Sequence, residues 1–301
     1  MPRSFGVTTL RVELGRKGAA HLLAEATVHG SANSFRAADL GAVKALAFDL
    51  DGTIYLQGTP LPGALELLAA LRQAGLSYLF VTNNSSVSGA TYMAKLAAIG
   101  LQPERHQVLT SNDVAMSHLH QAGIRRPYLL ATEEVRAAYA SEGLAHEEEA
   151  PDAVLLTFDT ELSFAKLAAA TRHISAGLPY LATHPDVTCP VPGGFLPDTG
   201  SFIELFAAAT GRRPQVLGKP HAGMIHEIGR RLQLPAEQIA FVGDRLQTDI
   251  HMAKDAGFVG VLTLTGVTQA DTLVTSPVQP DLVVTGMSEL HALLRQAALL
   301  P

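Results

Sequence analysis

The sequence contains a single cysteine, Cys189, among its 301 residues, and only 17% of the residues are charged. One cysteine can form neither an intramolecular disulfide nor a zinc site built from cysteines, which agrees with a reducing cytoplasm. No run reaches the roughly 18 apolar residues that a membrane-spanning helix needs. The 22 basic residues, against 28 acidic ones, are concentrated nowhere. We therefore expect a cytoplasmic protein with neither a membrane nor a nucleic-acid partner.

Apolar residues make up 47% of the chain, a fraction typical of globular proteins. This fraction excludes disorder for most of the chain. At about 150 residues per domain, the length suggests two domains. Residues 1–41 are expected to be a poorly ordered extension ahead of a domain that begins near Val43. They match the acid-poor, Arg- and Ser-rich pattern of a transit peptide poorly.

Short apolar runs alternate with helical patterns in two stretches, 42–110 and 212–301. Val43–Leu50, Ser77–Thr82 and Ile239–Gly243 have the character of buried parallel strands. The alternation predicts an α/β fold, namely a Rossmann-like parallel sheet with helices on both faces.

Residues 111–211 separate these two stretches and contain strand and helix patterns of their own. They could continue the main sheet. We favour a second, inserted α/β domain, because the strongest polar motifs lie on either side of the segment. The prediction is therefore a core formed by 42–110 and 212–301 and an inserted domain formed by 111–211.

The first polar motif, Asp49-Leu50-Asp51-Gly52-Thr53, directly follows an apolar strand. Side chains two apart on a strand share a face, so the two carboxylates would meet at the carboxyl end of a parallel strand, where open α/β sheets bind ligands. A divalent cation would keep Asp49 ionised and nucleophilic, and Asp51 could act as general acid and base. The alternative is a pair of acids that only caps the next element.

Three further motifs are weak when each is taken alone. Thr82-Asn83-Asn84-Ser85 can form an anion cradle or merely a turn. Lys219 lies between Gly218 and Pro220 and suits a phosphate, although most lysines are simply solvated. Asp244 could complete an oxygen-rich Mg²⁺ site with Asp49. Asp249 follows early in the next helix, where the helix dipole alone favours a carboxylate.

The four motifs together place acids, hydroxyl groups and one ammonium group at the ends of strands in one sheet. This is the equipment for phosphoryl transfer: a nucleophile, a hard cation and positive charge around the equatorial oxygens. The sequence contains neither a P-loop nor a His-Glu-x-x-His motif.

In these four motifs the chain resembles the haloacid dehalogenase (HAD) superfamily over about residues 43–297. Asp51 is the residue that phosphatase members have and dehalogenases lack. The Asp-Gly-Thr-Ile-Tyr and Thr-Asn-Asn-Ser segments are similar to the large-cap class II branch, the p-nitrophenyl phosphatase-like enzymes, in which a cap domain is inserted between the second and third motifs.

The resemblance implies a Mg²⁺-dependent phosphatase that hydrolyses small phosphomonoesters, such as sugar phosphates or nucleotide monophosphates. It implies an aspartyl-phosphate on Asp49, with Asp51 as acid and base. Lys219 would neutralise charge and, with Thr82 and Asn83, bind the phosphate. The metal would be held by Asp49, the carbonyl group of Asp51, Asp244 and, in an orienting role, Asp249. A phosphotransferase and a non-catalytic phosphometabolite-binding regulator remain alternatives.

The resemblance also places the leaving-group contacts in the inserted segment. Within Thr183–Ser201, which we expect to form loops, His184, Asp186 and Asp198 are the candidates for substrate specificity. Many relatives have Asn at position 184 and Gly at position 198. Caps of the family often mediate dimers, so a homodimer is also expected.

Overall fold

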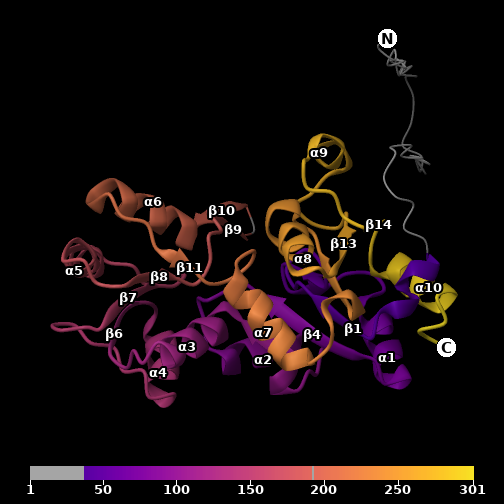
Figure 1. The fold of residues 1–301 in the computed structure, drawn as a ribbon, viewed down its shortest axis with the longest axis horizontal. Coiled ribbons are helices and arrows are strands. Elements are labelled where there is room, and N and C mark those ends of the chain that lie inside the picture. Colours follow the sequence, from indigo (N-terminus) through magenta and orange to yellow (C-terminus); the bar gives the residue numbers. More distant parts are fainter. Residues whose placement is uncertain (1–36, 192) are drawn as a thin grey trace, which may run out of the picture. The chain divides into compact units, whose positions relative to one another are not determined.

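The computed structural model describes residues 37–191 and 193–301, in which six strands form one sheet (Figure 1). The strand order is β14-β13-β12-β1-β4-β5, and every neighbouring pair is parallel. The predicted fold class is therefore confirmed. The strands are β1 (Ala45–Phe48), β4 (Ser77–Thr82), β5 (Val108–Thr110), β12 (Ile239–Gly243), β13 (Val259–Thr263) and β14 (Leu282–Val284).

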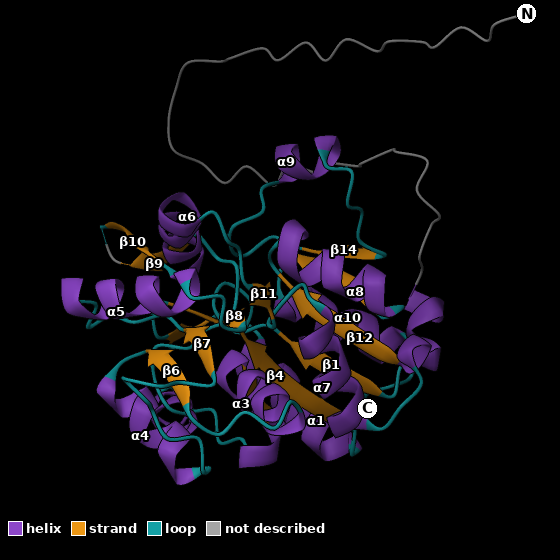
Figure 2. Cartoon of the chain, turned by 60° about the vertical axis from the view of Figure 1, so that its left-hand side comes forward, coloured by secondary structure: helices purple, strands orange, loops and turns teal. Residues whose placement is uncertain are grey.

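Helices cover both faces of this sheet (Figure 2), because successive strand side chains point to opposite sides. Leu46 and Phe48 of β1 pack into one apolar cluster, and Ala47 between them packs into another. The first cluster contains residues of α1 (Ala64–Ala74), α2 (Gly89–Ala98) and α10 (Met287–Gln296). The second contains residues of α3 (Ser111–Gln121), α7 (Ala222–Leu232) and α8 (His251–Ala256).

A second parallel sheet is formed between the two stretches of the core, in the order β11-β8-β7-β6. Its strands are β6 (Pro127–Leu130), β7 (Ala153–Leu156), β8 (Tyr180–Ala182) and β11 (Gln215–Val216). Its helices are α4 (Glu133–Ser141), α5 (Phe164–Ser175) and α6 (Thr199–Thr210). The segment thus does not continue the main sheet.

The predicted segment boundaries differ from the structure at both ends. Strand β11 pairs with β8, so a boundary at 211 leaves one strand out of the second sheet. Helix α3 packs against α7, a helix of the core. The described residues belong to one compact unit, and the division into a core and an inserted domain stays a prediction.

The segment that follows β8 is not made only of loops. It forms an antiparallel hairpin of β9 (Thr188–Val191) and β10 (Gly194–Pro197). Prolines in both strands concealed the hairpin from a sequence pattern, because proline is depleted from strands but is tolerated where no ladder donor is needed. The helix expected around Asp249 begins as a π-helical turn, Leu246–Ile250, and continues as α8.

The remaining elements are short. They are the hairpin β2 (Tyr55–Leu56) and β3 (Thr59–Pro60), helix α9 (Ala270–Thr275) and three 3₁₀ turns, Ala37–Ala42, Arg105–Gln107 and Ala236–Gln238. No helix among residues 37–191 and 193–301 is long and apolar enough to cross a membrane.

The core begins before the predicted boundary at residue 41. Residues 1–36, to which most of the predicted extension belongs, lie outside the described part of the chain. The 3₁₀ turn Ala37–Ala42, however, contacts α10, and Leu40 is only 1% exposed within the first apolar cluster. Its burial means that this end of the predicted extension is part of the packed core.

We therefore expect Leu40→Ala to lower the free energy of unfolding by about 2–5 kcal/mol, since it deletes a buried side chain and leaves a cavity. Urea denaturation of the full chain measures this loss. Lys44→Ala, at an exposed position nearby, is the control and should change stability by less than about 0.5 kcal/mol. Equal stabilities of the two variants would contradict this assignment.

Candidate active site

The four predicted motifs meet at the carboxyl ends of three adjacent strands. Asp49 follows β1, Thr82 ends β4, and Asp244 follows β12, the two strands that flank β1. The parallel register pairs Phe48 with both Val242 and Phe80, so the three chain ends leave the sheet together. They line one cleft of about 500 Å³, which Asp51, Asn83 and Lys219 also line.

A buried ammonium group lies between two of the carboxylates. Lys219 Nζ is 2.5 Å from Asp49 Oδ1 and 2.9 Å from Asp249 Oδ1, and its side chain is 3% exposed. Burial alone would lower the pKa of Lys219, but Asp249 and Asp49 outweigh it and raise that pKa above its usual range. Lys219 therefore stays charged in the protein interior.

Asp244 supplies a third buried carboxylate with an unused oxygen. Its Oδ2 accepts a hydrogen bond from the main-chain N–H of Val267 at 2.6 Å, while its Oδ1 has no partner among the described residues. One oxygen each of Asp49, Asp244 and Asp249 lies within 4.8 Å of the other two. Converging carboxylate oxygens with an unsatisfied buried acceptor fit a hard divalent cation.

The charge balance of the cluster supports the same conclusion. Burial raises the pKa of Asp49 to about 8: Lys219 opposes the rise, and the carboxylates of Asp249 and Asp244 add to it. Burial and the Asp249 carboxylate raise the pKa of Asp244 to about 6. Ionised Asp49 at neutral pH thus needs more positive charge than Lys219 supplies.

The absence of a side chain at Gly52 leaves room for the Asp244 carboxylate. A Cβ atom at Gly52, whose φ is +86°, would lie 2.7 Å from Asp244 Oδ2. Any larger residue would displace the carboxylate and would also be strained in this conformation. Gly52 of the first motif is therefore needed so that Asp244 of the fourth motif can keep its position.

The side chain of Asn83 is hydrogen-bonded to the main chain of Lys219. Its Oδ1 accepts from the main-chain N–H of Lys219 at 2.9 Å, and its Nδ2 donates to the Lys219 carbonyl at 3.1 Å. Nδ2 also lies 3.1 Å from Asp186 Oδ2. The side-chain amide thereby fixes the backbone of Lys219, and the predicted phosphate contact of Asn83 stays a prediction.

The side chains of Asp51 and Thr82 line the cleft and make few hydrogen bonds. Asp51 Oδ2 accepts a hydrogen bond from the Tyr55 hydroxyl at 3.0 Å, and its Oδ1 makes none with the described residues. Burial raises the pKa of Asp51 above its usual value, and the Tyr55 hydrogen bond partly opposes that shift. Thr82 Oγ1 accepts from the Asn84 N–H at 3.1 Å and keeps its own proton to donate.

The three specificity candidates have different surroundings. His184 Nε2 pairs with Asp198 Oδ1 at 2.9 Å, and both residues are buried and line the cleft. Asp186 instead bridges Asn83 and the guanidinium group of Arg245, whose NH1 lies 3.6 Å from Asp186 Oδ1. Asp198 also begins α6 as its N-cap rather than lying within a loop.

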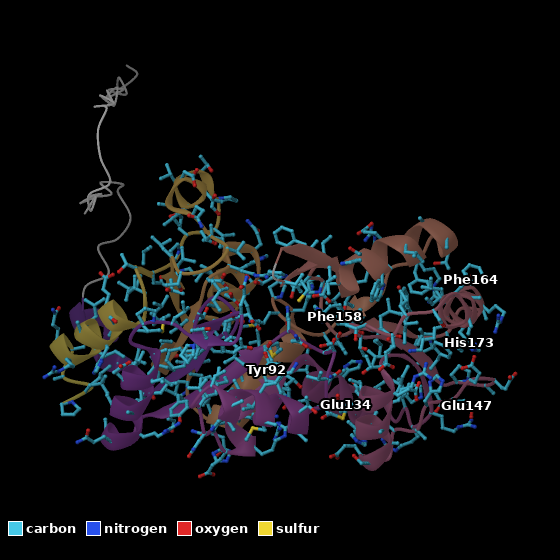
Figure 3. All side chains as sticks on the ribbon, turned by 180° about the vertical axis from the view of Figure 1, so that it is seen from behind. Tyr92, Glu134, Glu147, Phe158, Phe164 and His173 are labelled. Atoms are coloured by element: carbon cyan, nitrogen blue, oxygen red, sulfur yellow. The ribbon has the colours of Figure 1, made fainter. Side chains whose placement is uncertain are left out.

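A residue that the sequence reasoning passed over joins the core to the inserted segment. Ser85 is fully buried, and its Oγ accepts from the Phe158 N–H at 2.8 Å and lies 3.0 Å from Thr183 Oγ1 and 3.4 Å from His184 Nδ1. Phe158 is labelled in Figure 3. Ser85 belongs to the predicted Thr82-Asn83-Asn84-Ser85 motif, but the sequence of a turn does not indicate which distant residues a serine contacts.

Family models match both stretches of the core. Residues 46–145 match the model for haloacid dehalogenase-like hydrolases, and residues 216–290 match the HAD-hydrolase-like model. A 4-nitrophenylphosphatase of Schizosaccharomyces pombe is 31% identical over 81% of this chain and 91% of its own length. A 5′-nucleotidase of Bacillus subtilis is 29% identical over 82% of this chain and 96% of its own.

Solved structures agree with these sequence matches. The crystal structure of a 4-nitrophenylphosphatase from Thermotoga maritima superposes with a TM-score of 0.81 at 37% identity, covering 84% of this chain and 98% of that one. The chain therefore belongs to the haloacid dehalogenase-like hydrolases. The predicted family and its p-nitrophenyl phosphatase-like branch are confirmed, and the predicted enzyme class, a phosphoric monoester hydrolase, agrees with the names of these relatives.

Proposed function

We propose that the protein is a Mg²⁺-dependent phosphatase that hydrolyses small phosphomonoesters through an aspartyl-phosphate on Asp49. The observation that carries this proposal is the cluster of Asp49, Asp244 and Asp249 around the buried Lys219 ammonium at one end of the cleft. The relatives named above are phosphatases or nucleotidases, which supports the same reaction class.

In the first half of the reaction, Asp49 attacks phosphorus as the bond to the leaving oxygen breaks. Asp51 gives its proton to that oxygen, so the product leaves as an alcohol rather than an alkoxide. Lys219, at 2.5 Å from Asp49, offsets negative charge around the nucleophile. The Thr82 hydroxyl donates to a phosphoryl oxygen.

In the second half, Asp51 takes a proton from water, which attacks phosphorus and breaks the bond to Asp49. Inorganic phosphate leaves and the free carboxylate is restored. Asp49, the carbonyl group of Asp51 and Asp244 would hold Mg²⁺, with Asp249 beside them. When bound, the ion supplies positive charge that keeps Asp49 ionised and stabilises charge on the phosphoryl group.

The inserted segment supplies the wall that faces the leaving group. Apolar side chains of the β9–β10 hairpin, Val191 and Phe195, line the cleft together with His184 and Asp198. Asp198 uses Oδ1 for His184 Nε2 and for the Thr199 N–H, at 2.9 Å and 2.6 Å. Its Oδ2 makes no hydrogen bond with the described residues and can accept one from a hydroxyl group of the substrate.

The nucleophile and the acid should be separable by mutation. We expect Asp49→Asn to reduce hydrolysis of p-nitrophenyl phosphate by about 1000-fold or more, because an amide is a poor nucleophile. Asp51→Asn should cost about 10²–10⁴-fold and still form phosphoenzyme from this activated ester, measured after acid quench. Asp255→Asn, at an exposed position outside the cleft, is the control. Near-normal activity of Asp49→Asn would contradict the assignment of the nucleophile.

Metal removal should abolish turnover and lower thermal stability. Mg²⁺ at about 100 times its Kd should stabilise the folded protein by about 2.7 kcal/mol, and Asp244→Asn should lose most of this gain in thermal unfolding. Ca²⁺ should not replace Mg²⁺ in catalysis, because it takes more oxygen ligands at longer distances and would engage both oxygens of Asp49. Full activity in EDTA would rule out the metal model.

Variants at His184 and Asp186 should differ in how their effect depends on the substrate. We expect His184→Ala to lower kcat/KM for the best sugar phosphate or nucleotide at least about tenfold more than for p-nitrophenyl phosphate, whose leaving group needs little help. Asp186→Asn should lower both similarly, since Asp186 contacts Asn83, which fixes the Lys219 backbone. Equal losses on both substrates for His184→Ala would place specificity elsewhere.

A further inference from the structure

Two tyrosines form a chain of hydroxyl groups between Asp51 and Thr82. The Tyr55 hydroxyl of β2 donates to Asp51 Oδ2 at 3.0 Å and lies 2.8 Å from the Tyr92 hydroxyl of α2. The Tyr92 hydroxyl in turn lies 3.4 Å from Thr82 Oγ1. The chain therefore joins the proposed acid to a proposed phosphate ligand from behind the wall of the cleft.

Packing alone does not require these hydroxyl groups. Tyr92 is 2% exposed within the first apolar cluster, where phenylalanine would fill the same space (Figure 3). Burying an unpaired hydroxyl would cost free energy, and here each hydroxyl is satisfied mainly by the other and by residues of the cleft. Burial raises the pKa of both phenols well above the usual value, with Asp51 contributing, so both remain protonated.

Counting protons gives the chain a direction. Each tyrosine has one hydroxyl proton, so Tyr55 cannot donate to both Asp51 and Tyr92. When Tyr55 donates to Asp51, Tyr92 donates to Tyr55 across the shorter contact of 2.8 Å. Tyr92 then has no proton left for Thr82 Oγ1, so their 3.4 Å contact is not a hydrogen bond when Thr82 donates to a phosphoryl oxygen.

We propose that Tyr55, held in place by Tyr92, is a positioning residue that orients the Asp51 carboxyl group toward the leaving oxygen. The Tyr55 hydroxyl occupies Oδ2, which leaves Oδ1 to face the cleft. Asp51 directly precedes a turn, and its side chain makes no other hydrogen bond among the described residues. This inference rests on the proposed role of Asp51.

The main chain of the turn does not depend on the Tyr55 hydroxyl. The Gly52 N–H donates to the Tyr55 carbonyl at 2.7 Å, and the N–H groups of Ile54 and Tyr55 donate to the Leu50 carbonyl at 2.9 and 3.2 Å. Tyr55→Phe therefore removes the hydroxyl while keeping the turn and the ring. Loss of the hydroxyl leaves Asp51 free to rotate within the cleft.

The test compares Tyr55→Phe and Tyr92→Phe with a matched control. Tyr78→Phe also removes one hydroxyl from the same apolar cluster, but that hydroxyl accepts from Arg72 Nε at 2.8 Å and lies outside the chain. The full-length proteins are assayed with Mg²⁺ on p-nitrophenyl phosphate, phenyl phosphate and an alkyl phosphate. These esters differ in how much their leaving group needs a proton.

General acid catalysis is worth about 10²–10⁴-fold, and misplacing the acid should forfeit part of it. We expect Tyr55→Phe to lose less than about threefold in kcat/KM on p-nitrophenyl phosphate and about tenfold or more on the alkyl phosphate. This ratio reports phosphorylation of Asp49 and excludes the later hydrolysis step, in which Asp51 acts as base on every ester. Tyr92→Phe should show the same trend more weakly, and Tyr78→Phe should show none.

A double variant adds a second criterion. Tyr55→Phe should cost nothing further when Asp51 is already Asn, because the two residues would act as one unit. Equal losses of Tyr55→Phe on all esters, behaviour like Tyr78→Phe, or additive losses in the double variant would overturn the proposal. Asp51→Asn without any leaving-group dependence would instead contradict the proposed function itself, which keeps the two failures distinct.

Discussion

Lys219 carries its ammonium group into the protein interior, where it lies between the carboxylates of Asp49 and Asp249. A buried charge is tolerated only with partners, and removing one partner typically costs about 3–5 kcal/mol. The positions of the three groups are therefore interdependent, although 170 residues separate Asp49 from Lys219 in the sequence. The fold must return the chain to the same sheet edge after the whole inserted segment.

Polar contacts add to the apolar packing of Leu217 in securing that return. Asn83 makes two hydrogen bonds to the main chain of Lys219, so the loop after β4 determines where the ammonium group enters. At Gly218 a Cβ atom would lie 2.7 Å from Asn83 Oδ1 and 2.4 Å from the Thr183 carbonyl, so the approach tolerates no side chain. The Gly-Lys-Pro segment is a weak sequence motif, but its surroundings in the structure require both the glycine and the position of the lysine main chain.

The sequence predicted the strands of the main sheet and the residues that follow them, because both depend on hydrophobic periodicity and on where the apolar runs end. The strands Ser77–Thr82 and Ile239–Gly243 followed from short apolar runs that end in polar residues. The meeting of Asp49, Lys219 and Asp244 followed from the same pattern. It did not predict side-chain partners. Nothing in the chain order indicates that Asn83 turns to Lys219, or that Tyr92 reaches Tyr55 from a helix 37 residues away. The β9–β10 hairpin was missed because prolines interrupt its pattern.

The same loop also connects the proposed phosphate end of the cleft to the inserted segment, which we propose faces the leaving group. Asn83 contacts Asp186, and Ser85 contacts Phe158, Thr183 and His184, so two residues of this loop hold the inserted segment at two places, Phe158 and residues 183–186. Hydrogen bonds are directional and short-ranged, so a shift of the inserted segment would strain the loop that determines the position of Lys219. The proposed recognition of the leaving group and the placement of the charges around Asp49 thereby depend on one hydrogen-bond network.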